Sequence, residues 1–136
     1  MSEIKGERKR DIIRRKLKRL SEKDILKAMR DTLDDAYDFF KGKLGDYGVD
    51  VYKVAGGIGI ITRLREKNAR FDNLMMKTEE PNFESIRDTV QDMSVYATTL
   101  LAMIDKGLID LEELKEQYMT VFAVEEVVDE IVEEEI

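Results

Sequence analysis

The sequence predicts an all-α protein built as a bundle of four to five helices, and three features indicate this class. The 136 residues include a single proline, and 39% of them are charged, as is typical of solvated helices. Hydrophobic residues make up 43%, enough for a folded core. Apolar residues also recur at helical spacing, most clearly at Ile86, Val90, Met93, Ala97, Leu100 and Ile104.

The expected helical segments follow from this periodicity and from local start and stop signals. Ser21 followed by Asp24 resembles a capping box and starts the second helix, which Gly42 and Gly45 are expected to end. Residues 45–57 contain four glycines and are expected to be irregular. The expected helices are 7–20, 21 to about 41, 58–76, 83–106, 109–120 and 122–135.

The chain is expected to form one domain, 1–136, with an uneven distribution of its net charge of −7. Residues 1–20 form a basic N-terminal helix with nine Lys or Arg and three acids. Residues 21–106 form the core, and the acidic segment 107–136 has eleven acids and one Lys. A basic arm favours nucleic acid or a membrane surface as a partner, whereas packing of its apolar side against the rest of the chain is the simpler interpretation.

The absence of His and Cys excludes several kinds of chemistry. There can be no Ser-His-Asp or Cys-His triad, no zinc finger and no disulfide scaffold. Any catalysis must use carboxylates, Lys, Arg, Tyr, hydroxyls and oxygen-ligated cations such as Mg²⁺. The basic N-terminus is followed by no apolar signal-peptide region and no segment is apolar enough to span a membrane, so we expect a cytoplasmic protein with no membrane partner.

An acidic row on the helix expected at 83–106 is the first candidate site. Glu84, Asp88 and Asp92 fall on one side of this helix, opposite its apolar stripe. The segment from Met93 to Ile104, which follows the row, contains no charged residue. Convergent carboxylates are ligands that Mg²⁺ prefers, so the row predicts a metal site, and a solvated acidic face is the alternative.

A basic stripe on the preceding helix is the second candidate. Arg63, Lys67 and Arg70 are spaced four and three residues apart and therefore share one helix face, which suits phosphate binding. Glu66 could instead neutralise its neighbours Arg63 and Arg70 on the same helix. Together, the acidic row and the basic stripe are the parts of a Mg²⁺-polyphosphate site.

The order of several short motifs resembles a known family. Lys43, Asp46, Tyr47 and Gly48 are followed by a glycine-rich stretch, and then come Arg63-Leu64, Glu66-Lys67, Arg70-Phe71, Asn73-Leu74, Glu84-Ser85-Ile86, Asp88, Asp92 and Tyr96-Ala97. This succession, over about 37–106, is similar to the nucleotide-modification-associated domain of phages, a branch of the all-α MazG-type nucleoside triphosphate pyrophosphohydrolases. The first acidic motif of that family is ExxE, and this sequence has only one acid there, Glu66.

The resemblance implies Mg²⁺-dependent cleavage, with Mn²⁺ as a substitute, of an NTP or dNTP to the monophosphate and pyrophosphate. Glu66 and Asp88 would be catalytic, and Glu84, Asp88 and Asp92 would bind the metal. The residues expected to bind the substrate are Lys43, Asp46, Tyr47, Arg63, Lys67 and Arg70. Such a protein would act in phage nucleotide metabolism or DNA modification, in the host cytoplasm.

Two other functions remain open at this stage. A nucleotide-binding or sequestering protein without catalysis would fit the single acid of the first motif. A helical interaction protein could bind nucleic acid through residues 5–19. Under each of the three hypotheses we expect a homo-oligomer, because the uncharged stretch from Met93 to Ile104 needs more cover than a small bundle provides.

Overall fold

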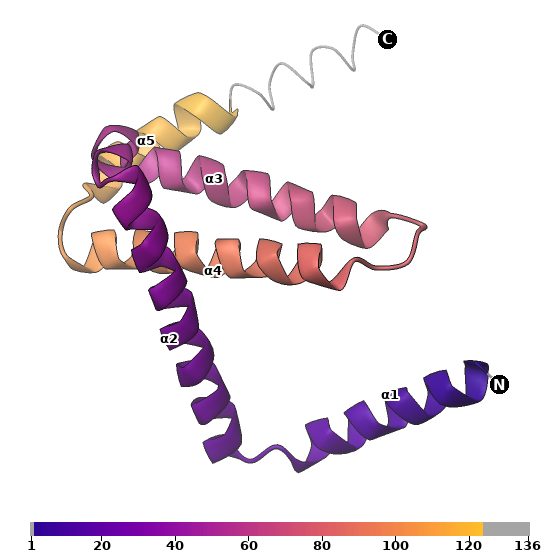
Figure 1. Ribbon diagram of the computed structural model, residues 1–136. Coiled ribbons are helices and arrows are strands. Elements are labelled where there is room, and N and C mark those ends of the chain that lie inside the picture. Colours follow the sequence, from indigo (N-terminus) through magenta and orange to yellow (C-terminus); the bar gives the residue numbers. More distant parts are fainter. Residues whose placement is uncertain (1, 124–136) are drawn as a thin grey trace, which may run out of the picture. The chain divides into compact units, whose positions relative to one another are not determined.

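The computed structural model describes residues 2–123, except for the side chains of residues 2–7, Tyr47 and Val51. The regular structure of this part of the chain consists of helices, joined by short loops, with no strand, so the predicted all-α class is confirmed (Figure 1). Its elements are α1 (Ser2–Arg19), α2 (Glu22–Tyr47), α3 (Asp50–Met76), α4 (Phe83–Asp105), α5 (Leu111–Tyr118) and a π-helical turn, η1 (Met119–Ala123). The last predicted helix, 122–135, lies outside the described residues from position 124 onward.

The chain divides into two units, the first ending at Asp38 and the second beginning at Phe39. The first unit contains α1 and most of α2. Its clearest local signal is the predicted capping box, which is confirmed: the Asp24 N–H donates to Ser21 Oγ (3.1 Å), and the Ser21 N–H donates to an Asp24 carboxylate oxygen (3.2 Å). These hydrogen bonds from Ser21 lower the pKa of Asp24, because they favour its charged form.

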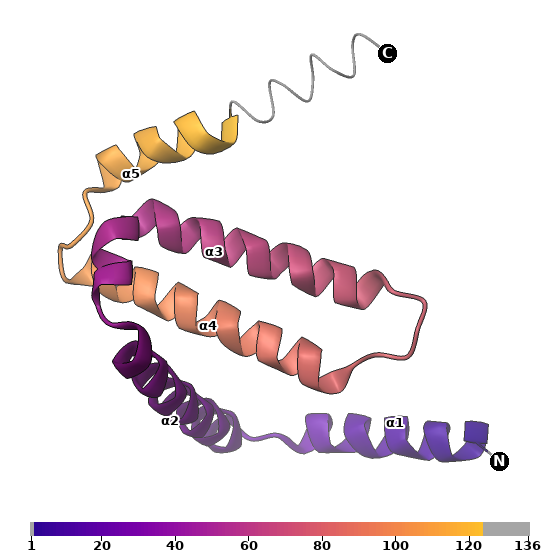
Figure 2. The same ribbon diagram turned by 45° about the horizontal axis from the view of Figure 1, so that its top comes forward.

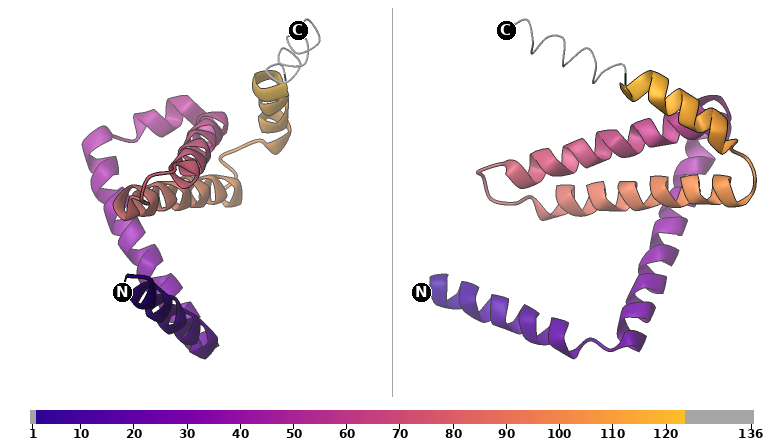
Figure 3. Two further views of the ribbon diagram at one scale, coloured as in Figure 1. Left: turned by 90° about the vertical axis from the view of Figure 1, so that its right-hand side faces the viewer. Right: turned by 180° about the vertical axis from the view of Figure 1, so that it is seen from behind.

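The second unit is organised around the antiparallel helices α3 and α4. Figure 2 shows them side by side and joined by the loop that contains Pro81, and the reverse view in Figure 3 agrees. The most buried side chains are Thr89 on α4, 2% exposed, and Ile60 on α3, 3% exposed. The Thr89 hydroxyl donates to the Ser85 carbonyl (2.7 Å), so this buried polar group has its partner.

The prediction that residues 45–57 are irregular is wrong, because most of this segment is helical. Gly42 and Gly45 do not end α2, which continues to Tyr47, since an internal glycine only weakens a helix. The chain instead turns at Gly48, whose φ is +78°, and α3 begins at Asp50. A break remains at Gly56, where φ is 61° and ψ is −164°, so the long straight part of α3 begins near the predicted position 58.

Both ends of α4 match the sequence signals. The Asn82 side chain accepts a hydrogen bond from the Ser85 N–H (3.0 Å) and caps the first turn. At the other end the N–H groups of Leu108 and Gly107 donate to the carbonyls of Met103 (2.9 Å) and Ile104 (3.1 Å), which is a Schellman motif. The predicted range 83–106 is therefore confirmed to within one residue.

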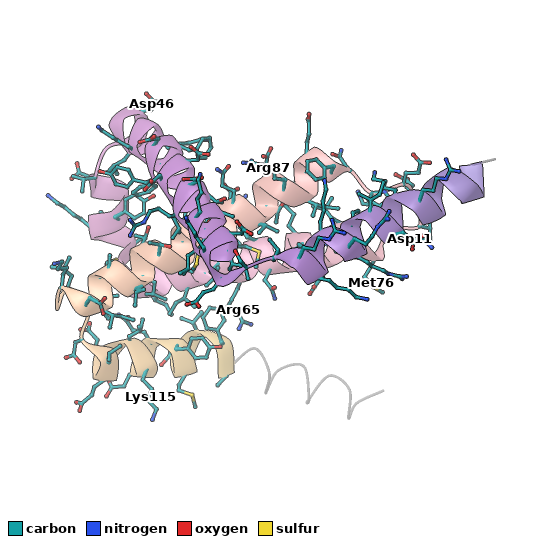
Figure 4. All side chains as sticks on the ribbon, turned by 90° about the horizontal axis from the view of Figure 1, so that it is seen from below. Asp11, Asp46, Arg65, Met76, Arg87 and Lys115 are labelled. Atoms are coloured by element: carbon teal, nitrogen blue, oxygen red, sulfur yellow. The ribbon has the colours of Figure 1, made fainter. Side chains whose placement is uncertain are left out.

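The helix α5 packs against α3 and is shorter than the predicted 109–120. Asp110 caps it by accepting from the N–H groups of Glu112 (3.0 Å) and Glu113 (3.4 Å). The guanidinium of Arg65 stacks on the Phe122 ring at 4.1 Å and donates to the Tyr118 hydroxyl (3.1 Å). Figure 4 labels Arg65 on the side of α3 that faces α5, and these contacts hold the π-helical turn against α3.

Candidate functional site

A groove in the described part of the second unit lies between the end of α2, α3 and α4. Its volume is about 700 Å³, within the range of small-molecule sites. It exists because α2 turns back at Gly48 into α3, so that the last turns of α2 and the middle of α3 form adjacent walls. Its lining residues are Phe39, Phe40, Lys43, Leu44, Tyr52, Ala55, Gly59, Ile60, Thr62, Arg63, Glu66, Lys67, Asp92, Val95 and Tyr96.

Five of the predicted site residues line this groove: Lys43, Arg63, Glu66, Lys67 and Asp92. Lys67 of α3 and Asp92 of α4 form an ion pair with an Nζ–Oδ2 distance of 3.0 Å. Their side chains are 29% and 34% exposed, so the pair is only partly screened by water. Arg63 pairs with Glu66 at 3.3 Å on the more exposed edge of the groove. The basic stripe and the acidic row are therefore in contact through one ion pair, between Lys67 of the stripe and Asp92 of the row.

The other predicted residues lie away from the groove lining or outside the described side chains. Glu84, Asp88, Arg70 and Asp46 are exposed and do not line the groove. Asp88 pairs instead with its neighbour Arg87, with 3.3 Å between the charged atoms. The side chain of Tyr47 is not among those described, so its expected contact with a base stays a prediction.

The three acids predicted to bind a metal are not brought together in one chain. Among the described residues, no group of three or more acidic side chains is close enough to share a metal ion. Carboxylates at positions i, i+4 and i+8 follow the helix axis and span about 12 Å, so one helix alone cannot converge them on one ion. Only Asp92 reaches the groove, where Lys67 already neutralises it. The described donor set does not fit the predicted three-carboxylate Mg²⁺ site.

Sequence reasoning missed the aromatic residues of the groove. Phe40 and Tyr52 meet edge to face with their ring centroids 5.7 Å apart, and Lys43 lies over the Phe39 ring at 5.1 Å. Tyr96 of α4 also lines the groove. Tyr52 was not singled out because its segment was expected to be irregular. Tyr96 was named only within the family resemblance and was given no role in the site.

Burial raises the pKa of Tyr52 above its ordinary value, and the proximity of Tyr96 raises it further. Both causes oppose a negative charge on the phenol. The neutral hydroxyl of Tyr52 is therefore a hydrogen-bond donor within the groove over the whole physiological pH range.

We expect Tyr52 to ionise above its ordinary pKa in an alkaline titration followed by ultraviolet difference spectroscopy. Since its pKa is raised in the folded state, the stability contributed by the neutral phenol is fully present below the unfolded pKa of about 10. This stability is lost as the pH rises through the folded pKa. Tyr52→Phe should remove a phase of the titration that lies above the ordinary pKa of tyrosine. An unchanged titration curve above that pKa in Tyr52→Phe would contradict the assignment.

Comparison with known proteins identifies no relative of this chain. No family model matches the chain, and neither the curated proteins nor the solved structures contain a significant match to it. The class that the structure defines is thus an all-helical protein with an aromatic and cationic groove. None of the helices of residues 2–123 is both long and apolar enough to cross a membrane.

Proposed function

We propose that the chain binds a nucleoside triphosphate in the groove between α2, α3 and α4. One observation carries the proposal: three cationic side chains, Lys43, Arg63 and Lys67, share a groove with the aromatic rings of Phe40, Tyr52 and Tyr96. Cations neutralise a polyphosphate, and aromatic faces stack on a base. A ligand with an anionic tail and a flat ring system satisfies both sets of groups.

The ion pairs of the groove indicate how a phosphate would enter. Lys67 and Arg63 are now neutralised by Asp92 and Glu66 respectively. A phosphate oxygen would replace a carboxylate as the partner of each cation. Arg63 is the more accessible of the two, because its side chain is 64% exposed, and it presents a planar fork of donors to the phosphate.

The experiment is a calorimetric titration of the full chain with a panel of NTPs and dNTPs, with Mg²⁺ and again with EDTA. Arg63→Ala should weaken binding about 10- to 100-fold, which is the typical effect of losing a charge-assisted hydrogen bond. Arg70→Ala is the matched control, because Arg70 belongs to the same basic stripe but does not line the groove. Its effect should stay below about twofold.

Two results would refute nucleotide binding in this groove. One is the absence of binding to every nucleotide of the panel. The other is an equal loss of affinity in the Arg63→Ala and Arg70→Ala variants, because it would show that only the total positive charge matters.

Hydrolysis of the bound nucleotide is the second candidate function. It is favoured by the presence of two carboxylates in the groove, Glu66 from α3 and Asp92 from α4, beside the cations. In that case Mg²⁺ or Mn²⁺ is the expected cofactor, the product pair is a monophosphate and pyrophosphate, and a role in phage nucleotide metabolism remains part of the proposal. Pyrophosphate release that is lost in Glu66→Gln and retained in Asp88→Ala would assign hydrolysis to the groove rather than to the exposed acidic row.

Self-association of the chain belongs to the same proposal. The described second unit buries few large apolar side chains, and many remain exposed on its helices. Nucleic-acid binding through α1 stays a separate prediction, which a comparison of binding with and without residues 1–20 at several salt concentrations would test.

A further inference from the structure

The helix α4 carries an apolar stripe that no described residue of the second unit covers. Phe83, Val90 and Leu101 on this stripe are exposed, as is Leu108 just after the helix, and Ala97 lies between them. At 100° per residue the four positions inside the helix, 83, 90, 97 and 101, fall within a band of about 40°. Leu108 follows the turn at Gly107, so helical spacing does not place it on this band. Asp92 and Tyr96, which line the groove, lie on the opposite side of α4.

The lack of charged residues along the central part of this stripe is typical of a protein–protein interface and not of a solvated helix face. No charged residue occurs from Met93 to Ile104 in any direction around the helix. A solvated face would carry charges over three turns, as the exposed face of the preceding helix α3 does. An exposed apolar band of this length marks a docking surface.

The order of side chains along the stripe is symmetric about its centre. Within α4, Val90 and Ser94 have the same separations from the centre as Leu101 and Ala97. When such a helix packs against an antiparallel copy of itself, the large side chain of Val90 meets that of Leu101 of the copy. The small residues Ser94 and Ala97 meet at the centre, where they allow a close approach of the two helices.

The charges at the two ends of the stripe are placed almost symmetrically, because Arg87 lies one residue closer to the centre than Asp105. Arg87 lies near one end and Asp105 near the other, both on the side of the stripe. In the antiparallel arrangement, Arg87 of each chain lies beside Asp105 of the other, so opposite charges face each other twice. Arg87 would then exchange its present partner, Asp88, for this residue of the other chain. A parallel arrangement would instead place equal charges together.

We propose that the chain forms a two-fold symmetric dimer in which α4 packs antiparallel against α4 of a second copy. A patch that is complementary to itself is what a two-fold interface requires. This proposal does not depend on nucleotide binding, because the groove and the stripe lie on opposite sides of α4.

The oligomeric state is tested by sedimentation velocity over a range of concentrations. The wild-type chain should have twice the monomer mass of 15.8 kDa. Leu101→Glu should raise the dimer dissociation constant at least about 30-fold, because each chain then places a charge against the apolar side chain of Val90 of the other. Leu111→Glu is the matched control, since Leu111 on α5 is 56% exposed and Leu101 is 57% exposed. This control should remain a dimer.

Charge reversal tests the interface without relying on a buried charge. Arg87→Asp and Asp105→Arg should each weaken the dimer, and the double variant should restore it. The helical circular dichroism of all variants should remain unchanged, because both positions are exposed in the second unit.

Cysteine cross-linking tests the direction of pairing, and the chain has no native cysteine to interfere. Ser94→Cys should form a disulfide-linked dimer under mild oxidation, because position 94 lies near the two-fold axis. Phe83→Cys should not, because the two copies of position 83 would be roughly 37 Å apart along the helix axis. A monomeric wild-type chain, a dimer that is unaffected by Leu101→Glu, or efficient cross-linking of Phe83→Cys would each overturn the proposal.

Discussion

Replacing Ile60 with alanine is expected to lower the free energy of unfolding by about 2–5 kcal/mol. Ile60 is 3% exposed and is the most buried apolar side chain among the described residues. Its truncation removes three buried carbon atoms and leaves a cavity between α3 and its neighbours. The groove should lose its shape as well, because Ile60 lines it.

The effect is measured by urea denaturation at one fixed protein concentration, since a self-associating chain has a concentration-dependent stability. Val54→Ala on the same helix is the control, because Val54 is 89% exposed. Its effect should stay within about 0.5 kcal/mol. Equal effects of the two substitutions would mean that α3 does not pack as described.

The second large effect is expected at Gly56, where alanine should destabilise the second unit by about 1–3 kcal/mol. The cause is the backbone and not a lack of space, because no atom lies within 4 Å of the position that a Cβ would occupy. With φ at 61° and ψ at −164°, Gly56 adopts a conformation that is open almost only to glycine. Without this break, α3 would continue straight from Asp50, and Tyr52 would leave its place in the groove.

Gly45→Ala provides a control with the opposite sign. Gly45 lies inside α2 with a negative φ, and the position of its missing Cβ is also open. Alanine there should stabilise the protein by about 0.5–1 kcal/mol, because it lowers the entropy that helix formation costs. Thermal unfolding of both variants tests the pair, and destabilisation by Gly45→Ala would show that the two glycines had been assigned the wrong roles. Nucleotide affinity should fall with Gly56→Ala and stay unchanged with Gly45→Ala.

The candidate site could be predicted in part from the sequence. The spacing of Arg63 and Lys67 correctly places both on one face of α3, and both line the groove. The row of Glu84, Asp88 and Asp92 was expected to converge on a metal, but only Asp92 reaches the groove. Spacing along a helix shows which residues share a face. It does not show how far along the helix a neighbouring element extends.

Most helix boundaries were determined by the sequence, because their signals are local; the end of α2 and the start of α3 were not. Periodic apolar residues, the Ser21–Asp24 capping box, the Asn82 cap and the turn at Gly107 all act within a few residues. The partner of Lys67 is Asp92, 25 positions further along the chain, and only the packing of α3 on α4 decides this pairing. The break at Gly56 was likewise decided by tertiary structure, because a glycine's sequence context does not distinguish a tolerated helical position such as Gly45 from a positive-φ one.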